Sequence, residues 1–195
     1  MTLVPGDISL IIGPMFSGKS TELFRKLRRE KVASKRCLLI KYAGDNRYSV
    51  DKASSHDKYM MSAISLQKLS ELTDTFNWEG TVCSLADIDV IGIDEGQFFP
   101  DIAEFSELWS SKGIKVIIAA LDGDFKRKPF GNILDVVPIS KKVNKLTAVC
   151  MAKDENDKVC GEPASFSKRI VESNAVELIG GSESYIATCH KCYLS

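Results

Sequence analysis

The 195-residue sequence has no excess of either charge, because 26 lysine and arginine residues balance 26 aspartate and glutamate residues. A protein dedicated to duplex nucleic acid usually carries a basic surplus, since neutralising phosphates drives its affinity. Histidine is also scarce: His56 and His190 are the only two, and they lie far apart in the chain. The sequence therefore argues against a stable nucleic-acid partner, a Ser-His-Asp triad and a histidine-rich metal site.

Long apolar runs are absent as well. The longest, residues 116–121, has the length of a buried strand and falls far short of the roughly 20 residues that cross a bilayer. Near the N-terminus, Asp7 interrupts the apolar residues before they reach signal-peptide length. With 44% hydrophobic and 27% charged residues, the composition is that of an ordinary globular protein. We expect a cytoplasmic protein with no membrane partner.

Short apolar runs alternate with amphipathic stretches over the first three quarters of the chain. Runs rich in β-branched residues predict buried strands at residues 8–12, 37–40, 90–93 and 115–121. Helical spacing predicts helices at residues 20–33, 66–76 and 101–111, the last with Leu108 on its apolar face, and polar residues predict a loop at 44–58. This alternation is typical of a parallel sheet covered on both faces. We predict an α/β domain over residues 1–145.

The last quarter of the chain has a different pattern and holds four of the six cysteines. Helical periodicity gives way to short β-like runs at residues 147–149, 175–179 and 185–188. Cys189 and Cys192 form a C-x-x-C pair typical of zinc ribbons, whereas nine residues separate Cys150 from Cys160. The polar insert can bulge outward at little cost, because loop-closure entropy grows slowly with length. We predict a small β-rich module at residues 146–195 in which four thiolates hold structural zinc.

The segment after the first predicted strand carries the strongest functional signal. Gly13 to Ser20 reads GPMFSGKS, which fits G-x-x-x-x-G-K-[ST] in full, between a predicted strand and a predicted helix. The glycines allow backbone N–H groups to converge on phosphate oxygens, and the helix N-terminus adds its positive dipole end. Lys19 is expected to reach the β- and γ-phosphates, and the Ser20 hydroxyl to hold Mg²⁺. The sequence therefore predicts binding of a nucleoside triphosphate.

Two carboxylates, Asp94 and Glu95, directly follow the third predicted strand. Asp94 would bind Mg²⁺, and Glu95 would act as a base on either a water molecule or a substrate hydroxyl. The pair alone does not separate hydrolysis from phosphoryl transfer. Three aromatic residues that follow predicted strands, each of which also suits a core position, would together form a slot for a nucleobase: Phe98, Phe125 and Phe130.

Two other classes of protein remain open on these residues. An ATPase motor or repair protein of the RecA-like type would use the same phosphate loop, and its ATP turnover would not require a nucleoside. A zinc-ribbon nucleic-acid binder would show salt-sensitive affinity for nucleic acid, which the zero net charge disfavours. The aromatic residues near Glu95 favour a small acceptor that contains a ring.

Six runs, in order along nearly the whole chain, resemble the cytosolic, zinc-containing (type II) thymidine kinases. They are GPMFSGKST from Gly13, IKYAGDNRYS from Ile40, VIGIDEGQFFP from Val90, ALDGDFKRKPFG from Ala120, KLTAVCM from Lys145, and Ile179-Gly180-Gly181 with Tyr185. The resemblance implies a P-loop (RecA-like) α/β fold with a mostly parallel sheet, helices on both faces and a small zinc-binding lasso, or lid. It also implies transfer of the γ-phosphoryl group of Mg-ATP to the 5′-hydroxyl of thymidine, in nucleotide salvage for DNA synthesis.

The resemblance further implies roles for individual residues, with Glu95 as general base and Lys19 as the second catalytic residue. ATP and Mg²⁺ would contact Gly13, Pro14, Met15, Phe16, Ser17, Gly18, Lys19, Ser20, Thr21, Asp45, Asn46, Arg47, Asp94, Glu95, Gly96 and Gln97. Thymidine would contact Met15, Phe98, Leu121, Phe125 and Phe130, and also a lid at about residues 165–185 that contributes Ser167, Val176, Glu177, Leu178, Ile179, Gly180 and Tyr185. Thymidine triphosphate would be a feedback inhibitor, and the assembly would be a homotetramer.

Overall fold

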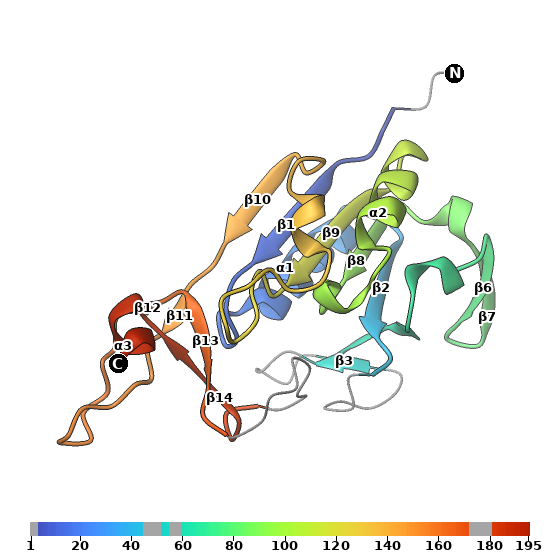
Figure 1. The fold of residues 1–195 in the computed structure, drawn as a ribbon. Helices are drawn as coiled ribbons and strands as arrows, with labels where there is room; N and C mark the ends of the chain where they lie inside the picture. The colour runs from blue at the N-terminus through green and yellow to red at the C-terminus, as the bar shows by residue number, and fades with distance from the viewer. Residues whose placement is uncertain (1–3, 45–51, 55–59, 172–180) are drawn as a thin grey trace.

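The computed structural model describes residues 4–44, 52–54, 60–171 and 181–195. At its centre is a six-stranded sheet in the order β10-β1-β9-β8-β2-β5, in which all neighbouring strands are parallel (Figure 1). The strands are β1 (Ile8–Ile12), β2 (Cys37–Tyr42), β5 (Ile64–Leu66), β8 (Val90–Ile93), β9 (Lys115–Ala120) and β10 (Lys142–Lys145). The four predicted strands form the middle of the sheet, and the two edge strands, β5 and β10, were not predicted.

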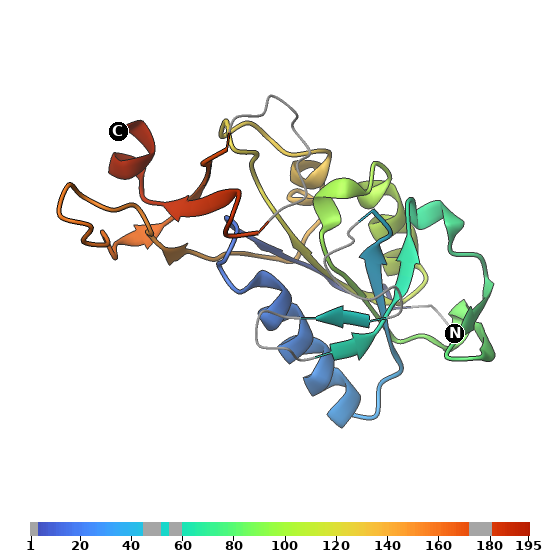
Figure 2. The same ribbon diagram turned by 90° about the horizontal axis from the view of Figure 1, so that it is seen from below.

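Helices cover both faces of the sheet, as predicted (Figure 2). Helix α1 (Lys19–Val32) buries its apolar stripe on one face, and α2 (Ile102–Ser111) packs on the other. Successive residues of β1 contribute to these two cores, Ile11 to the α1 side and Ile12 to the α2 side, because strand side chains alternate. Leu108 was predicted on the apolar face of α2 but is 42% exposed. The inner stripe of α2 instead follows helical spacing through Ile102, Ser106 and Trp109.

The predicted helix over residues 66–76 is wrong. The segment contains the end of β5, a 3₁₀ turn η1 (Leu69–Glu71) and the start of β6 (Thr75–Trp78), which pairs with β7 (Thr81–Ser84). Leu66, Leu69 and Leu72, which suggested a helix, are still buried in the core, and Phe76 packs against it. An extended chain that docks on a sheet can bury the same residues. The Asp101 carboxylate accepts the backbone N–H groups of Leu69 and Ser70 at 3.1 and 2.9 Å, which stabilises the turn.

Among its described residues, the expected loop at residues 44–58 contains a short strand, β3 (Lys52–Ser54), which pairs with β4 (Met60–Ser62). Other parts of that prediction lie outside the described residues. Three further 3₁₀ turns connect the main elements: η2 (Leu85–Asp87), η3 (Gly96–Phe98) and η4 (Ile133–Val136). Within the described residues, no helix has the length and apolar character of a membrane span.

After β10 the chain builds a small β-rich module at one end of the molecule (Figure 1). Its antiparallel pairs are β11 (Ala148–Val149) with β12 (Pro163–Ala164), and β13 (Phe166–Arg169) with β14 (Tyr185–Thr188). A short helix, α3 (His190–Leu194), follows them. The module has its own small apolar core. The predicted runs at 147–149 and 185–188 are confirmed as strands, and the run at 175–179 lies outside the described residues.

Candidate active site and metal centre

The parallel sheet brings distant segments of the chain together at the edge formed by the carboxyl ends of its strands. Gly13 follows β1, Leu121 follows β9 and Asp94 follows β8, so all three lie at the carboxyl ends of neighbouring strands. This edge is where α/β sheets bind their ligands. The Ser20 hydroxyl donates to Asp94 Oδ1 at 2.9 Å across 74 positions of sequence. The phosphate loop and the first carboxylate are therefore direct neighbours.

The phosphate loop forms a tight turn between β1 and α1. Gly13 has φ 148°, and a Cβ at this position would lie 2.5 Å from the Leu146 carbonyl oxygen, which excludes any larger residue. The Ser17 hydroxyl and the Lys19 ammonium group both donate to the Pro14 carbonyl oxygen, at 2.9 and 2.6 Å. The lysine thus folds back over the loop at the N-terminal end of a 14-residue helix, where backbone N–H groups and the helix dipole favour an anion.

Asp94 is a buried carboxyl group beside a second carboxylate. Burial and the charge of Glu95 raise the pKa of Asp94 to about 7. A bound cation would remove this penalty, because it would attract both charges. The Ser20 hydroxyl and the Asp94 carboxylate are hard oxygen donors next to a phosphate site, and this combination suits Mg²⁺.

Glu95 is positioned by its backbone and by a buried amide. Its φ of 54° is in the left-handed region, which is uncommon for a residue with a side chain. The Gln97 side-chain NH₂ group donates to Glu95 Oε2 at 2.7 Å. The side-chain oxygen of the same residue, Oε1, accepts the Leu121 backbone N–H at 2.9 Å. Since Gln97 is only 3% exposed, it connects the Glu95 carboxylate to the end of β9.

The predicted aromatic residues fall into two contact groups. Phe98 stacks on Tyr42 with ring centroids 4.8 Å apart, and Phe130 meets Phe98 edge-on at 5.4 Å. The Phe125 ring is covered by the guanidinium group of Arg169 at 3.8 Å. Tyr42 and Arg169 were both missed at the sequence level. For Tyr42 the available signal was its place at the carboxyl end of β2.

Two predicted lid residues are described and contact the site. The Ser167 hydroxyl accepts the Met15 N–H at 2.9 Å, so the small module touches the phosphate loop directly. Tyr185 is buried, and its hydroxyl oxygen accepts hydrogen bonds from the Arg169 guanidinium at 2.5 and 3.2 Å. Phe16 of the phosphate loop packs against the core of the module. The other lid and nucleotide predictions lie outside the described residues: Asp45, Asn46, Arg47, Val176, Glu177, Leu178, Ile179 and Gly180.

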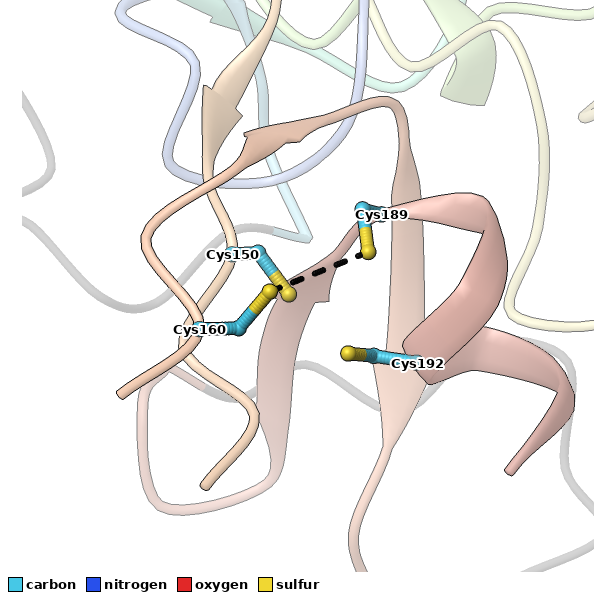
Figure 3. Close-up of side chains that lie close together, drawn as sticks. All are labelled: Cys150, Cys160, Cys189 and Cys192. Carbon is cyan, nitrogen blue, oxygen red and sulfur yellow. Dashed lines mark hydrogen bonds between the residues drawn. The ribbon is translucent and has the colours of Figure 1, made fainter. Parts of the chain in front are cut away.

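The four cysteines of the last quarter converge (Figure 3). Their Sγ atoms lie within 4.8 Å of one another, and Cys160 Sγ is 4.0 Å from Cys189 Sγ. A tetrahedron with metal–sulfur bonds of about 2.3 Å has edges of about 3.8 Å, so this cluster could hold a metal ion. The nine-residue insert closes as a hairpin with a bridge between Lys153 and Val159, which explains how Cys150 and Cys160 meet.

The sulfur atoms of the cluster shift one another's pKa values in opposite directions. A hydrogen bond from the Cys192 backbone, together with the neighbouring thiols, lowers the pKa of Cys189 to about 7. The pKa of Cys192 is instead raised to about 12, because its sulfur neighbours stabilise its protonated form. Neighbouring thiols of this kind compete for protons, as coupled acids do. A metal ion bound by all four sulfurs would leave no open coordination position, which is typical of a structural site.

Fold and site together define an enzyme of the P-loop class that acts on a nucleoside triphosphate. The family model for thymidine kinase matches residues 6–193. The thymidine kinases of vaccinia virus and variola virus are each 50% identical to this chain over 189 residues, which cover 97% of this chain and 97% of each relative. The monkeypox virus thymidine kinase is 49% identical over the same length. The chain therefore belongs to the thymidine kinase family and is a kinase.

Proposed function

We propose that this protein transfers the γ-phosphoryl group of ATP to the 5′-hydroxyl of thymidine, giving thymidine monophosphate and ADP. The observation that carries the proposal is the 2.9 Å contact between Ser20 and Asp94, with Glu95 next in sequence. It supports a site in which oxygen donors for a cation and a candidate base lie beside one phosphate loop. Membership of the thymidine kinase family supports thymidine as the acceptor.

On the donor side, the loop from Gly13 to Gly18 would hold the triphosphate with its backbone N–H groups. Lys19 would leave the Pro14 carbonyl oxygen, 2.6 Å away, and bind phosphate oxygens. Ser20 and Asp94 would hold Mg²⁺, which neutralises charge on the β- and γ-phosphates. Further nucleotide contacts are proposed for Thr21, Asp45, Asn46, Arg47 and Gly96.

On the acceptor side, Glu95 would accept the proton of the 5′-hydroxyl as that oxygen bonds to the γ-phosphorus and the bond to ADP breaks. Gln97 donates to Glu95 Oε2 and so orients the carboxylate for this step. Water must be excluded during this step, because Glu95 would otherwise promote ATP hydrolysis. The thymine would lie among Met15, Phe98, Leu121, Phe125 and Phe130, under a lid that contributes Ser167, Tyr185 and residues 176–180.

We also propose zinc as the metal of the four-cysteine centre, because an all-sulfur tetrahedral donor set suits zinc. The domain boundary would lie near residue 145, between the end of β10 and the start of β11. Family membership supports a cytoplasmic homotetramer that is inhibited by thymidine triphosphate, a compound that carries both thymine and a phosphate chain. Light scattering and inhibition by that compound test these two expectations.

The test of the proposed function is ADP formation from Mg-ATP with thymidine, with deoxycytidine and without nucleoside. Turnover that depends on thymidine supports the proposal, whereas turnover without any nucleoside assigns the protein to the ATPases. The Glu95→Gln variant should keep ATP binding but lose about 10²- to 10⁴-fold in rate, the usual contribution of a general base. Glu104→Gln, on the exposed side of α2, is the matched control and should keep the full rate.

A further inference from the structure

We propose that Arg127 and Tyr193 are positioning residues that couple the four-cysteine centre to the loop carrying Phe125, so that the metal centre controls affinity for the nucleoside. This inference rests on the proposed function. Neither residue is among the predicted substrate contacts. Both lie at the contact between the small module and the loop that follows β9.

The loop between β9 and η4 contains a tight turn that is held by hydrogen bonds within the loop. The Asp124 carboxylate accepts the backbone N–H groups of Lys126 and Lys128, each at 2.8 Å. Between them, Arg127 has φ 59°, in the left-handed region that residues with a side chain rarely adopt. Hydrogen bonds within the loop hold this backbone conformation, and it directs the Arg127 side chain out of the turn, so contacts of that side chain fix where the turn lies.

That side chain is held by aromatic rings of the small module. The Arg127 guanidinium lies over the Tyr193 ring at 4.4 Å and over the Phe166 ring at 5.5 Å from the centroids. The Tyr193 hydroxyl also donates to the carbonyl oxygen of Phe125 at 2.7 Å. Two independent contacts, one through a cation on aromatic faces and one through a hydrogen bond, thus fix the backbone on either side of Lys126.

The position of Tyr193 depends in turn on the metal centre. It directly follows Cys192, and its backbone N–H donates to the Cys189 carbonyl oxygen at 3.0 Å. The helix that carries it, α3, has five residues, too few for a helix to be stable on its own in water. The two cysteine ligands at the start and middle of this turn therefore set where the Tyr193 ring and hydroxyl lie.

The consequence falls on the acceptor side of the site. Phe125 is proposed to contact the thymine, and its carbonyl oxygen is the acceptor for Tyr193. When the centre loses its metal, α3 unwinds, the hydrogen bond and the ring contacts with Arg127 are lost, and the backbone at Phe125 loses this support, although its ring still contacts Arg169. The metal centre would then control the KM for thymidine through two named side chains.

The test compares the wild type with Tyr193→Phe, Arg127→Ala and their double variant. Tyr193→Phe keeps the ring and removes only the hydroxyl. We expect each single variant to raise the KM for thymidine by about 3- to 10-fold while the KM for ATP stays within about 2-fold, in line with the loss of one hydrogen bond or one cation–π contact. Lys128→Ala removes the same charge one position away and should leave both KM values unchanged.

Metal removal gives the second readout. Stripping the metal from the wild type should raise the KM for thymidine and speed hydrogen exchange over residues 121–131. In the double variant, that segment should already exchange fast with metal bound, and stripping should change its exchange little. Unchanged thymidine KM in both single variants would overturn the inference, and so would loss of metal by the single variants, because the residues would then build the centre instead of transmitting its order.

The two proposals fail in different ways. A wild-type protein without thymidine-dependent turnover would refute the proposed function, whatever the exchange data show. The coupling alone is refuted if the wild type phosphorylates thymidine but hydrogen exchange over residues 121–131 changes neither on metal removal nor in the variants.

Discussion

Replacing Gln97 by methionine removes a buried amide from between the Glu95 carboxylate and the end of β9. Methionine has nearly the same shape and length, so the core packing around η3 is retained. Two hydrogen bonds are lost, one of 2.7 Å to Glu95 Oε2 and one of 2.9 Å from the Leu121 N–H. The perturbation is therefore chemical and not steric.

The magnitude follows from the nature of the two bonds. The bond to the carboxylate contributes about 1–2 kcal/mol, since Glu95 is partly exposed and a charged acceptor there is partly solvated. The Leu121 N–H is left without its partner at a partly buried position, which costs about 1–3 kcal/mol. The sum of about 2–5 kcal/mol is below the 5–15 kcal/mol stability of a typical domain. The variant should still fold, with a lower urea midpoint.

The effect on rate is larger than the effect on folding. Without the amide, the Glu95 carboxylate loses the hydrogen bond that orients Oε2, and a displacement of about 1 Å from the reacting group costs about 10²-fold. We expect kcat to fall by about that factor while the KM for ATP is unchanged. Gln67→Met, at an exposed glutamine outside the site, is the control for the substitution itself. A kcat within about 3-fold of wild type would refute the positioning argument for Gln97.

Four shorter predictions concern other parts of the molecule. Ser20→Ala should raise the Mg²⁺ concentration for half-maximal rate by roughly 10- to 100-fold, because one oxygen donor is lost, and a Mg²⁺ titration of the rate checks this. Chelation of the metal, or Cys160→Ser, should lower the Tm in calorimetry, whereas Cys83→Ser, outside the cluster, should not. Gly131→Ala should reduce activity and stability together, since Gly131 has a φ of +55° and the new Cβ would lie 2.2 Å from the backbone carbonyl oxygen of Gln97. Burial raises the pKa of Cys37 to about 11, so iodoacetamide at pH 8 should spare Cys37 in the folded protein. Because this folded-state pKa exceeds the unfolded value, the protonated thiol contributes stability that is fully present below the unfolded pKa of about 9 and is lost as the pH rises towards 11. Between pH 8 and pH 10.5, the urea midpoint should therefore fall less in Cys37→Ala than in the wild type.

The sequence predicted those parts of the fold that depend on local patterns. The four central strands are near-continuous apolar runs, and such runs are typical of strands buried on both faces. The phosphate loop depends on a glycine-rich turn between a strand and a helix, all within residues 8–32. The four-cysteine centre was predicted from residue type and is confirmed as a cluster, although its first pair has unusual spacing.

Predictions failed where one apolar pattern fits two structures. The buried leucines of residues 66–76 have helical spacing, yet they dock on the sheet from an extended segment with a single turn. The edge strand β10 (Lys142–Lys145) has charged residues at both ends and no apolar run, so its pairing with β1 depends on the neighbouring strand and not on its own composition.

The sequence by itself determined the chemistry of this protein: a phosphate loop, two carboxylates after a strand, four thiols and the family that combines them. These features are residue types at short spacing, and their chemistry is intrinsic to them. Only the tertiary structure decided which groups meet, such as Gln97 with Glu95 and Leu121, or Arg127 with Tyr193. Such contacts can join segments far apart in the sequence, 66 positions for Arg127 with Tyr193 and 152 for Met15 with Ser167. Their partners are set by strand order and by the path of the chain between modules.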